Sequence, residues 1–448
     1  MNEDFILSIY DLLLTPIYVL IIYVIATYIK KKRQWEEPIY RYYVKGLLVK
    51  IAGAIALCLI YQFYYSGGDT TNYFITAKTF ANILSKNWET FISIMGGNNT
   101  IENYSVFDGN TGYPVYWRDS KSVFVSILLV PIFFVSGGSF ITCAVILASV
   151  CYSGIWKLFL LFTRQFPEIE KQLAISILFI PSVVFWGSGI LKDTITLSAV
   201  CWYVYYFYFF FIKKMYKTKN ILFVFISAYI IISIKPYILF ALLPGSIIWL
   251  SSEQLYKIKN KVFRALAAPL FLIIGVSVGF ITLSQMDKSL GDYSLDKVLD
   301  KAVISNQDQK QVYYGGNSFD IGNFDANLVS MLGKAHLAIA ATLFRPYLWD
   351  VRNPVMLISA LENTYIMLLT FILLLRLKII SFFTLINKNP LLLFSVLFAV
   401  FFAFSVGIAT SNFGSLVRLK IPCIPFFVSS LFILKHFYEK KTKKKLGI

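Results

Sequence analysis

Residues 64–88 read YYSGGDTTNYFITAKTFANILSKNW and set the organisation of the chain. They follow a fully apolar segment, so the chain leaves the bilayer here and at once presents Gly67, Gly68 and Asp69. Two glycines allow a tight backbone turn, which directs the carboxylate back towards the membrane surface. An acid at a water–lipid boundary can act as a base, although a solvated loop acid is the simpler interpretation unless other residues converge on it.

The composition of the whole chain predicts a polytopic membrane protein. Of the 448 residues, 57% are hydrophobic and only 15% are charged, and the mean hydropathy is +0.67. Apolar runs of about 20 residues recur, which is the length that crosses a bilayer as a helix. The runs lack the alternation of a membrane barrel. We therefore expect an all-α fold that forms a single integral membrane domain over residues 1–448.

The charge and the cysteines exclude several other classes of function. The net charge of +18 is concentrated in short loops between apolar runs, a pattern that orients helices in a membrane and does not indicate nucleic acid as a partner. All five cysteines lie inside apolar segments without metal-ligand spacing, and only two histidines are present. We expect no cofactor, and a divalent metal has no supporting cluster.

Apolar runs and basic loops together predict about eleven transmembrane helices, with the N-terminus outside and the C-terminus cytoplasmic. The predicted spans are residues 7–29, 46–64, 140–162, 173–190, 194–212, 221–233, 237–250, 265–284, 355–375, 391–409 and 421–434. Two long external loops, 66–121 and 285–353, contain the more polar sequence. We expect an amphipathic helix over 74–95 at the membrane surface, and an interfacial or re-entrant helix over 122–135.

This topology gathers ionisable residues at the external face of the membrane. Asp69 is the candidate base there, and the same face carries Lys192, Asp193, Lys235, Arg345, Arg352 and Arg418. Cations at the depth of lipid headgroups suit a phosphate or pyrophosphate whose lipid tail stays in the bilayer. Guanidinium groups bind phosphate oxygens with a two-pronged geometry, so the arginines are the stronger candidates.

The arginines also have structural interpretations. Arg345 and Arg352 could form a loop ion pair with Asp350, and Arg418 at the edge of a span could reach headgroups by snorkelling. These alternatives stay open at the level of sequence.

The residues around the predicted hairpin at 191–193 have structural interpretations as well. Lys192 and Asp193 could cap the two helices that they separate. Lys235 is harder to explain as a solvated residue, because both of its flanks are short and apolar, and a charge there is costly unless it is paired or used.

Three stretches in the first half of the chain resemble one known family. The stretch GGDTTNYFITAKTFANILSKNW places Asp69 at an acidic motif and Tyr73 at an aromatic position four residues later. It is followed by the helix RDSKSVFVSILLVPIFFVSGG and then by FIPSVVFWGSGILKDTITLSAV, whose second acid is Asp193. Together they resemble the GT-C superfamily of membrane glycosyltransferases. Many members carry two adjacent acids, whereas Thr70 follows Asp69 here, which implies a lone base without a metal.

The resemblance implies a function in cell-envelope polysaccharide biosynthesis at the plasma (inner) membrane. A sugar would move from a polyprenyl-phosphate donor to a glycan or lipid acceptor on the external face, with inversion, and Asp69 would act as the catalytic base. Tyr73 and the ionisable residues of that face would bind the substrates, among membrane lipids.

Other functions remain open at this stage. The stretches FRPYLWDVRNP and FGSLVRLKIPCIPFF resemble polymerases and ligases of bacterial surface polysaccharide, in which arginines would act on lipid-pyrophosphate oligosaccharides. A transporter of a lipid-linked substrate is an alternative of another class, and Glu362 inside a predicted span favours it. A scaffold subunit of a cell-envelope assembly is a third possibility.

Overall fold

The computed structural model describes residues 6–257, 295–311, 317–377 and 379–446, and within these ranges the chain is helical apart from turns and one isolated bridge between Ser318 and Asn412. Six of the described helices are long and apolar enough to cross a membrane, or up to seven if the bent pair Phe413–Leu419 and Ile424–Thr442 forms one span. The structure thus supports an all-helical polytopic membrane protein. The predicted count of about eleven is not reached by these helices, and the predicted span 265–284 lies outside the described residues.

The chain divides into two compact units. Unit 1 comprises residues 1–161, 183–205 and 223–235, and unit 2 comprises residues 162–182, 206–222 and 236–448. The prediction of one integral membrane domain stays a prediction.

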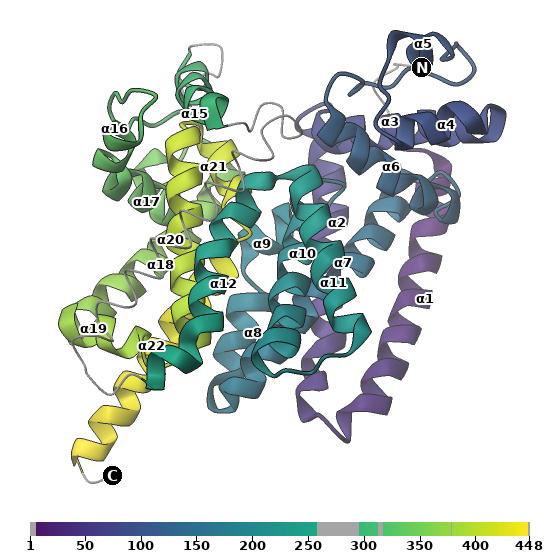
Figure 1. Cartoon of the computed structure of the whole chain (residues 1–448). Coiled ribbons are helices and arrows are strands. Elements are labelled where there is room, and N and C mark those ends of the chain that lie inside the picture. The colour runs from purple at the N-terminus through teal and green to yellow at the C-terminus, as the bar shows by residue number, and fades with distance from the viewer. Residues whose placement is uncertain (1–5, 258–294, 312–316, 378, 447–448) are drawn as a thin grey trace. The chain divides into compact units, whose positions relative to one another are not determined.

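Unit 1 is built from a bundle of long helices and a lobe of shorter ones. The elements that lie wholly or mostly in it are α1 (Ile9–Gln34), η1 (Pro38–Tyr42), α2 (Tyr43–Phe63), α3 (Asp69–Lys86), α4 (Trp88–Met95), α5 (Ile101–Ser105), α6 (Ser120–Val135), α7 (Phe140–Gln165), α9 (Pro181–Trp186), α10 (Lys192–Phe207) and α11 (Thr218–Ile234). In Figure 1, α1, α2 and α7 run alongside one another, whereas α3 and α4 lie across the end of this group.

The buried carboxylate of Asp11 joins the starts of α1 and α7, so these two helices of unit 1 begin at the same end. Asp11 accepts hydrogen bonds from the backbone N–H of Ser8 (2.8 Å) at the start of α1 and from that of Ile141 (2.7 Å) at the start of α7. These N–H groups lack partners within their own helices, so the carboxylate stabilises both helix starts.

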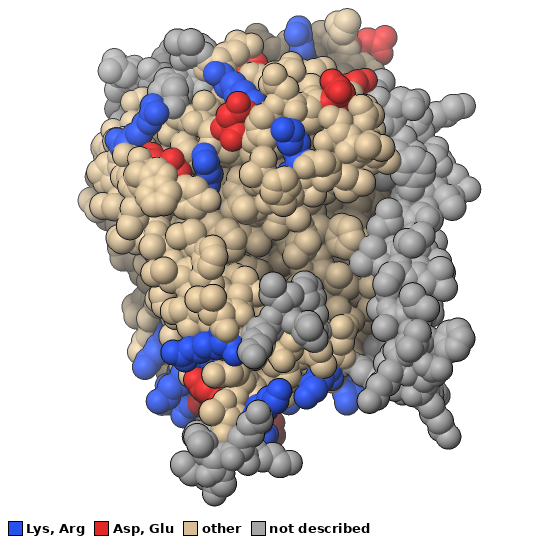
Figure 2. Space-filling view, turned by 90° about the vertical axis from the view of Figure 1, so that its left-hand side faces the viewer, with Lys and Arg blue, Asp and Glu red and all other residues tan. Residues whose placement is uncertain are grey.

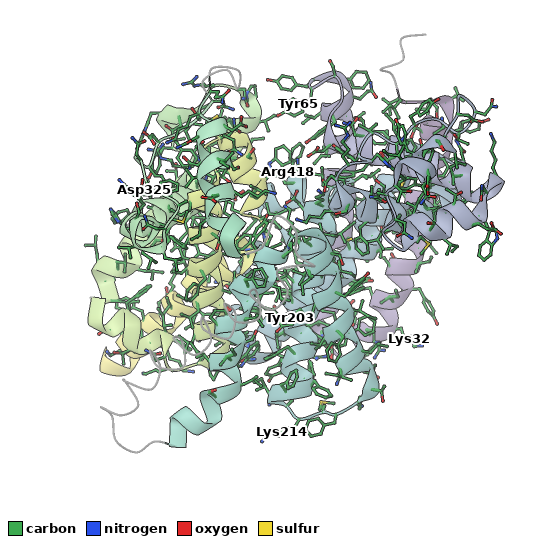
Figure 3. All side chains as sticks on the ribbon, turned by 45° about the horizontal axis from the view of Figure 1, so that its top comes forward. Lys32, Tyr65, Tyr203, Lys214, Asp325 and Arg418 are labelled. Carbon is green, nitrogen blue, oxygen red and sulfur yellow. The ribbon has the colours of Figure 1, made fainter. Side chains whose placement is uncertain are left out.

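Figure 3 shows Tyr65, just after α2, at the opposite end of the unit from Lys32 in the last turn of α1. We call the end that carries Tyr65 the Asp69 end.

Helices α3 to α6, residues 69–135, form a lobe at the Asp69 end. The helix predicted over 74–95 is divided in the structure, because Asn87 ends α3 and its side chain accepts a hydrogen bond from Thr90 N–H to begin α4 (3.1 Å). Helix α6 matches the helix predicted over 122–135. Phe80, Phe91, Phe107 and Val123 are buried in a common apolar cluster, so the lobe has its own core.

Where the sequence predicted a single span over 173–190, the structure has two short helices, α8 (Glu170–Leu178) and α9. The break falls before Pro181, which has no N–H to donate and whose ring clashes with a continuous helix. In unit 2 the Glu362 carboxylate accepts hydrogen bonds from the N–H (2.8 Å) and hydroxyl (2.6 Å) of Ser182. In unit 1 the buried Lys50 ammonium donates to the Gly187 carbonyl just past α9. Ionisable side chains thus satisfy backbone groups that the break leaves without helical partners.

Unit 2 contains the rest of the described helices. They are η2 (Pro167–Ile169), α8, the π-helical turn η3 (Tyr208–Ile212), α12 (Pro236–Lys257), α15 (Leu295–Asp308), α16 (Leu328–Gly333), α17 (Ala335–Phe344), η6 (Leu348–Asp350), α18 (Pro354–Leu377), α19 (Ile379–Ile386), α20 (Pro390–Ala409), α21 (Phe413–Leu419) and α22 (Ile424–Leu446). Helices α18 and α20 confirm two predicted helical segments. Figure 2 shows one face of the molecule on which a nearly uncharged band separates a zone of mixed charge from a zone of mainly Lys and Arg. Such a band is expected where a protein contacts hydrocarbon.

Candidate functional site

Two glycines position Asp69, as the sequence predicted. Gly67 and Gly68 adopt φ values of +118° and +126°, which residues with a side chain rarely adopt. At Gly68 a Cβ atom would also lie 3.0 Å from the ring of Tyr61, so the turn has little room for another residue. The turn ends α2 and starts α3 within a few residues, and Asp69 becomes the first residue of α3, half-buried.

Asp69 and Tyr73 lie one turn apart on α3 and contact the same segment, residues 116–122. The Tyr116 hydroxyl donates a hydrogen bond of 2.6 Å to Asp69 Oδ1. The ring of Tyr116 packs on that of Tyr73 with centroids 4.9 Å apart. The Tyr73 hydroxyl lies 3.4 Å from Ser122 Oγ, and it is the donor, because Ser122 uses its own proton on Asp119 (2.5 Å). The carboxylate and aromatic positions are thereby tied to the start of α6.

Asp119 connects this segment to α10. It caps α6 by accepting from Lys121 N–H (3.1 Å), and its second oxygen, Oδ2, lies 2.8 Å from Lys192 Nζ. Partial burial would raise the pKa of Asp119, but the hydrogen bonds from Lys192 and Ser122, with the charge of Lys192, outweigh it and hold that pKa below its ordinary value. The side chain of Asp119 is 45% exposed and that of Lys192 is 16% exposed, so the pair lies at the protein surface.

The next residue of α10 makes a different ion pair. Asp193 contacts Lys235, which follows α11, through a short ion pair whose side chains are 0% and 8% exposed. The two charges neutralise each other within the protein. Burial in this ion pair favours a structural role for Asp193, and the capping role suggested from the sequence stays a prediction. Lys192 is more accessible than Lys235.

Five of the eight predicted site residues therefore belong to one connected group in unit 1, which we call the Asp69 network; the pair of Asp193 and Lys235 joins it through the chain, because Asp193 follows Lys192. Its predicted members are Asp69, Tyr73, Lys192, Asp193 and Lys235, and its members that the sequence reasoning missed are Tyr116, Asp119 and Ser122. One signal for Asp119 was present, because an acid directly before a helical apolar run is a typical N-cap. Tyr116 had no comparable local signal.

The three predicted arginines lie in unit 2. The guanidinium of Arg345 lies over the rings of Phe319 and Tyr347, 5.4 and 5.1 Å from their centroids. Among the described residues, Asp350 does not pair with Arg345, since it accepts from the backbone N–H of Tyr347 instead (2.9 Å). Arg352 follows η6.

Arg418 lies on α21, which is joined to the surroundings of Arg345. The ring of Phe413 at the start of α21 packs on that of Phe319 (5.4 Å). Lys420, two residues beyond Arg418, is fully buried and donates to the carbonyl of Arg345 (3.0 Å) and to Asn363 Oδ1 (2.8 Å). The structure therefore brings the segments of Arg345 and Arg418 together, and it gives Lys420 partners within the protein.

Ligands for a metal are not evident in the part of the chain that the structure describes: no group of three or more His, Cys, Asp or Glu side chains lies together there. The expectation that the chain needs no metal stays an expectation. Comparisons of the chain with protein-family models, with curated proteins and with solved structures gave no match.

Proposed function

We propose that the chain is a membrane glycosyltransferase that moves a sugar from a polyprenyl-phosphate donor to a glycan or lipid acceptor. The observation that supports this is the Asp69 network. Residues from four distant parts of the sequence, around positions 69, 119, 192 and 235, meet at the end of unit 1 where several apolar helices begin or end. A carboxylate and an accessible ammonium at such a boundary can serve a reaction on a substrate whose tail stays in lipid.

In the proposed reaction Asp69 acts as general base. The acceptor hydroxyl transfers its proton to Asp69 while its oxygen forms a bond to the anomeric carbon of the donor sugar. The bond from that carbon to the phosphate oxygen breaks, and polyprenyl phosphate leaves with the bonding electrons. Tyr116 orients Asp69 through its hydrogen bond.

Lys192 is the cation of the network best placed to hold the developing phosphate charge, because an ammonium has three donors and its pair with Asp119 is not fully buried. Lys235 is less suited, because its charge is already matched by Asp193 in a buried pair. Orientation with the Asp69 end outside the cell is part of the proposal, and the phosphate-binding roles of Arg345, Arg352 and Arg418 in unit 2 stay predictions.

The test is transfer of a labelled sugar from polyprenyl phosphate in proteoliposomes. Asp69→Asn keeps the shape of the side chain and should lower the rate by about 10²–10⁴-fold, the usual contribution of a general base. Glu89→Gln, at an exposed acid on α4, is the matched control and should transfer at the wild-type rate. Wild-type rates in correctly folded Asp69→Asn protein would end the proposal.

A polymerase of lipid-pyrophosphate oligosaccharides is a second candidate, and the setting of Arg345 favours it. Two aromatic rings hold the guanidinium in place, with no carboxylate partner for it among the described residues, so it is pre-oriented to bind phosphate oxygens. In a polymerase, Arg345→Ala should reduce chain extension more than Asp69→Asn does. The opposite ranking supports the transferase.

A transporter is the candidate of another class, and the broken helix favours it. Discontinuous membrane helices whose ends are satisfied by ionisable side chains are typical of transporters, and Glu362 with Ser182 forms such a contact. A carrier would move intact labelled lipid across the bilayer, and Glu362→Gln would stop that movement. A transferase would convert the labelled lipid to polyprenyl phosphate and glycosylated acceptor.

A further inference from the structure

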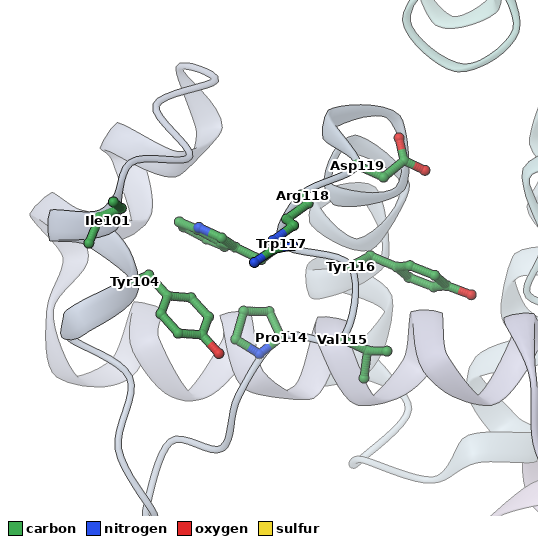
Figure 4. Close-up of a pocket in the computed structure, with 8 residues that line it drawn as sticks. All are labelled: Ile101, Tyr104, Pro114, Val115, Tyr116, Trp117, Arg118 and Asp119. Carbon is green, nitrogen blue, oxygen red and sulfur yellow. The ribbon is translucent and has the colours of Figure 1, made fainter. Parts of the chain in front are cut away.

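A cavity of about 460 Å³ lies in the α3–α6 lobe beside the Asp69 network. Its lining includes Ile101, Tyr104, Pro114, Trp117, Arg118 and Asp119. Figure 4 shows Tyr104, Pro114 and Trp117 on one side of the 114–119 segment, and Tyr116 and Asp119 on the other. This volume is within the range of sites that bind small molecules.

Side chains of α3 hold the lining segment in place. Thr76 Oγ1 accepts from Val115 N–H (3.2 Å), and Asn82 Nδ2 donates to the Thr111 carbonyl (3.1 Å). The hydrogen bond from Tyr116 to Asp69 adds a third link to the same helix. Two positions of α3 thus hold the segment itself and a third holds the chain just before it, which restricts the movement of the lining and lowers the cost of ordering it around a ligand.

Trp117 is a rigid aromatic surface in this cavity. Its ring packs edge-on against Phe107 (5.4 Å), which is buried in the apolar cluster of the lobe, and it contacts the ring of Tyr104 (5.6 Å). Trp117 and Tyr104 both line the cavity, whereas Phe107 lies behind them in the core of the lobe. The aromatic wall is thus supported from behind by the core of the lobe.

The polar groups of the cavity include both signs of charge. Arg118 is exposed and supplies donors, and the half-exposed carboxylate of Asp119 supplies acceptors. Both residues line the cavity, so a ligand there has charged side chains within its surroundings.

We propose that this cavity is a binding subsite for a sugar ring of a glycan. A pyranose has a face of polarised C–H groups, which an aromatic ring attracts through its negative face, and an edge of hydroxyls that both donate and accept. The aromatic wall and the charged side chains of the lining offer partners for these two sides. That the bound glycan is the acceptor rests on the proposed function, because Tyr116 lines the cavity and also contacts Asp69.

Other ligands fit this chemistry less well. A phosphate headgroup would gain from Arg118 but would make no use of the aromatic wall formed by Tyr104 and Trp117. A lipid chain has no donors or acceptors, so it would form no hydrogen bond with Arg118 or Asp119. The sugar satisfies the apolar and the polar side together.

Binding of the purified full chain to an array of neutral, N-acetylated and uronic-acid-containing oligosaccharides tests the subsite. We expect retention on at least one of these classes, with Trp117→Ala weakening it by about tenfold or more. Arg118→Gln, at an exposed position that leaves the lobe core intact, should weaken it as well. Trp88→Ala is the matched control, because Trp88 is 62% exposed on α4 of the same lobe and does not line the cavity.

The outcomes separate this inference from the transferase. Asp69→Asn should bind the retained glycan like the wild type while failing to transfer sugar, and Trp117→Ala should raise KM for the glycan acceptor. Glycan binding that depends on Trp117 without any transfer would keep the subsite and end the transferase. Three outcomes would overturn the subsite. The wild type could retain no class of saccharide, or Trp117→Ala and Arg118→Gln could retain the glycan as well as the wild type does. Trp117-dependent binding of phosphatidylglycerol vesicles in place of a glycan would be the third.

Discussion

Two consecutive residues at the start of α10, Lys192 and Asp193, each form an ion pair between an aspartate and a lysine. The two pairs differ in burial. Asp193 and Lys235 are almost completely enclosed, with exposed fractions of 0% and 8%. Asp119 and Lys192 keep exposed fractions of 45% and 16%, and Asp119 also accepts from Ser122 and caps α6. One pair belongs to the interior of unit 1, and the other faces its surroundings.

This difference separates a structural role from a chemical one. A buried pair contributes little net stability, but removal of one partner leaves an uncompensated charge inside the protein. A surface pair is worth little to stability, and water or a ligand can compete for it. In the sequence Lys192 had a capping role as an alternative, and Lys235 was the harder of the two to explain without a function, whereas burial favours the opposite assignment.

The largest effect is expected at the buried pair. Asp193→Asn should lower the free energy of unfolding by about 3–5 kcal/mol, because Lys235 would stay buried while residue 193 no longer carries the opposite charge. The double variant Asp193→Leu, Lys235→Met should recover most of this loss, since neither charge is then buried. Denaturant unfolding in detergent, followed by tryptophan fluorescence, measures both.

The exposed pair of Lys310 and Asp320 provides the control for this measurement. Its side chains are 26% and 65% exposed, and Lys310→Met should change the free energy of unfolding by less than about 1 kcal/mol. A double variant at Asp193 and Lys235 that is as unstable as the single variant would mean that the pair matters for packing rather than for charge.

The features that could be predicted from the sequence are those encoded locally. The glycine turn before Asp69 and the helix after it follow from residues 67–73, and the helices of 140–162 and 391–409 follow from long apolar runs. Backbone conformation and hydropathy act over a few residues, so one sequence is enough to predict them.

The features that could not be predicted depend on partners far along the chain. Asp119 meets Lys192 across 73 positions, and Ser182 meets Glu362 across 180. Pro181 was a visible signal for a broken helix, but the apolar sequence around it favoured a single span. Whether an ionisable residue is paired or available is decided by these tertiary contacts.

A smaller effect is expected at the exposed pair of the network. Asp119→Asn should lower the free energy of unfolding by only about 1 kcal/mol, because its bonds to Lys192 and Ser122 are partly screened by solvent. Its effect on sugar transfer should be larger than its effect on folding, if Lys192 serves the donor phosphate. A loss as large as that of Asp193→Asn, measured in the same unfolding assay, would remove the distinction between the pairs.

The pH dependence of stability sharpens the same distinction. The pKa of Asp119 is lowered in the folded state, so its contribution is complete above the unfolded pKa of about 3.9 and is lost as pH falls through the lower folded value. The difference in unfolding free energy between the wild type and Asp119→Asn should therefore be constant from pH 8 to 5 and vanish in stronger acid. Thermal unfolding measured from pH 8 into stronger acid tests this. A difference that already disappears at pH 6 would contradict the lowered pKa of Asp119.

The smallest effect on folding is expected at Tyr116, whose hydroxyl reaches Asp69 at the edge of the network. Tyr116→Phe removes one hydrogen bond to a half-buried carboxylate, which should cost about 0.5 kcal/mol of unfolding free energy. Tyr113→Phe, at an exposed tyrosine of the same lobe, is the control and should cost nothing measurable. If Asp69 is the base, Tyr116→Phe should lower the rate of sugar transfer several-fold while leaving folding nearly unchanged, because the carboxylate keeps its charge but loses the contact that orients it. Equal transfer by Tyr116→Phe and Tyr113→Phe would show that this contact holds the lobe together without serving the reaction.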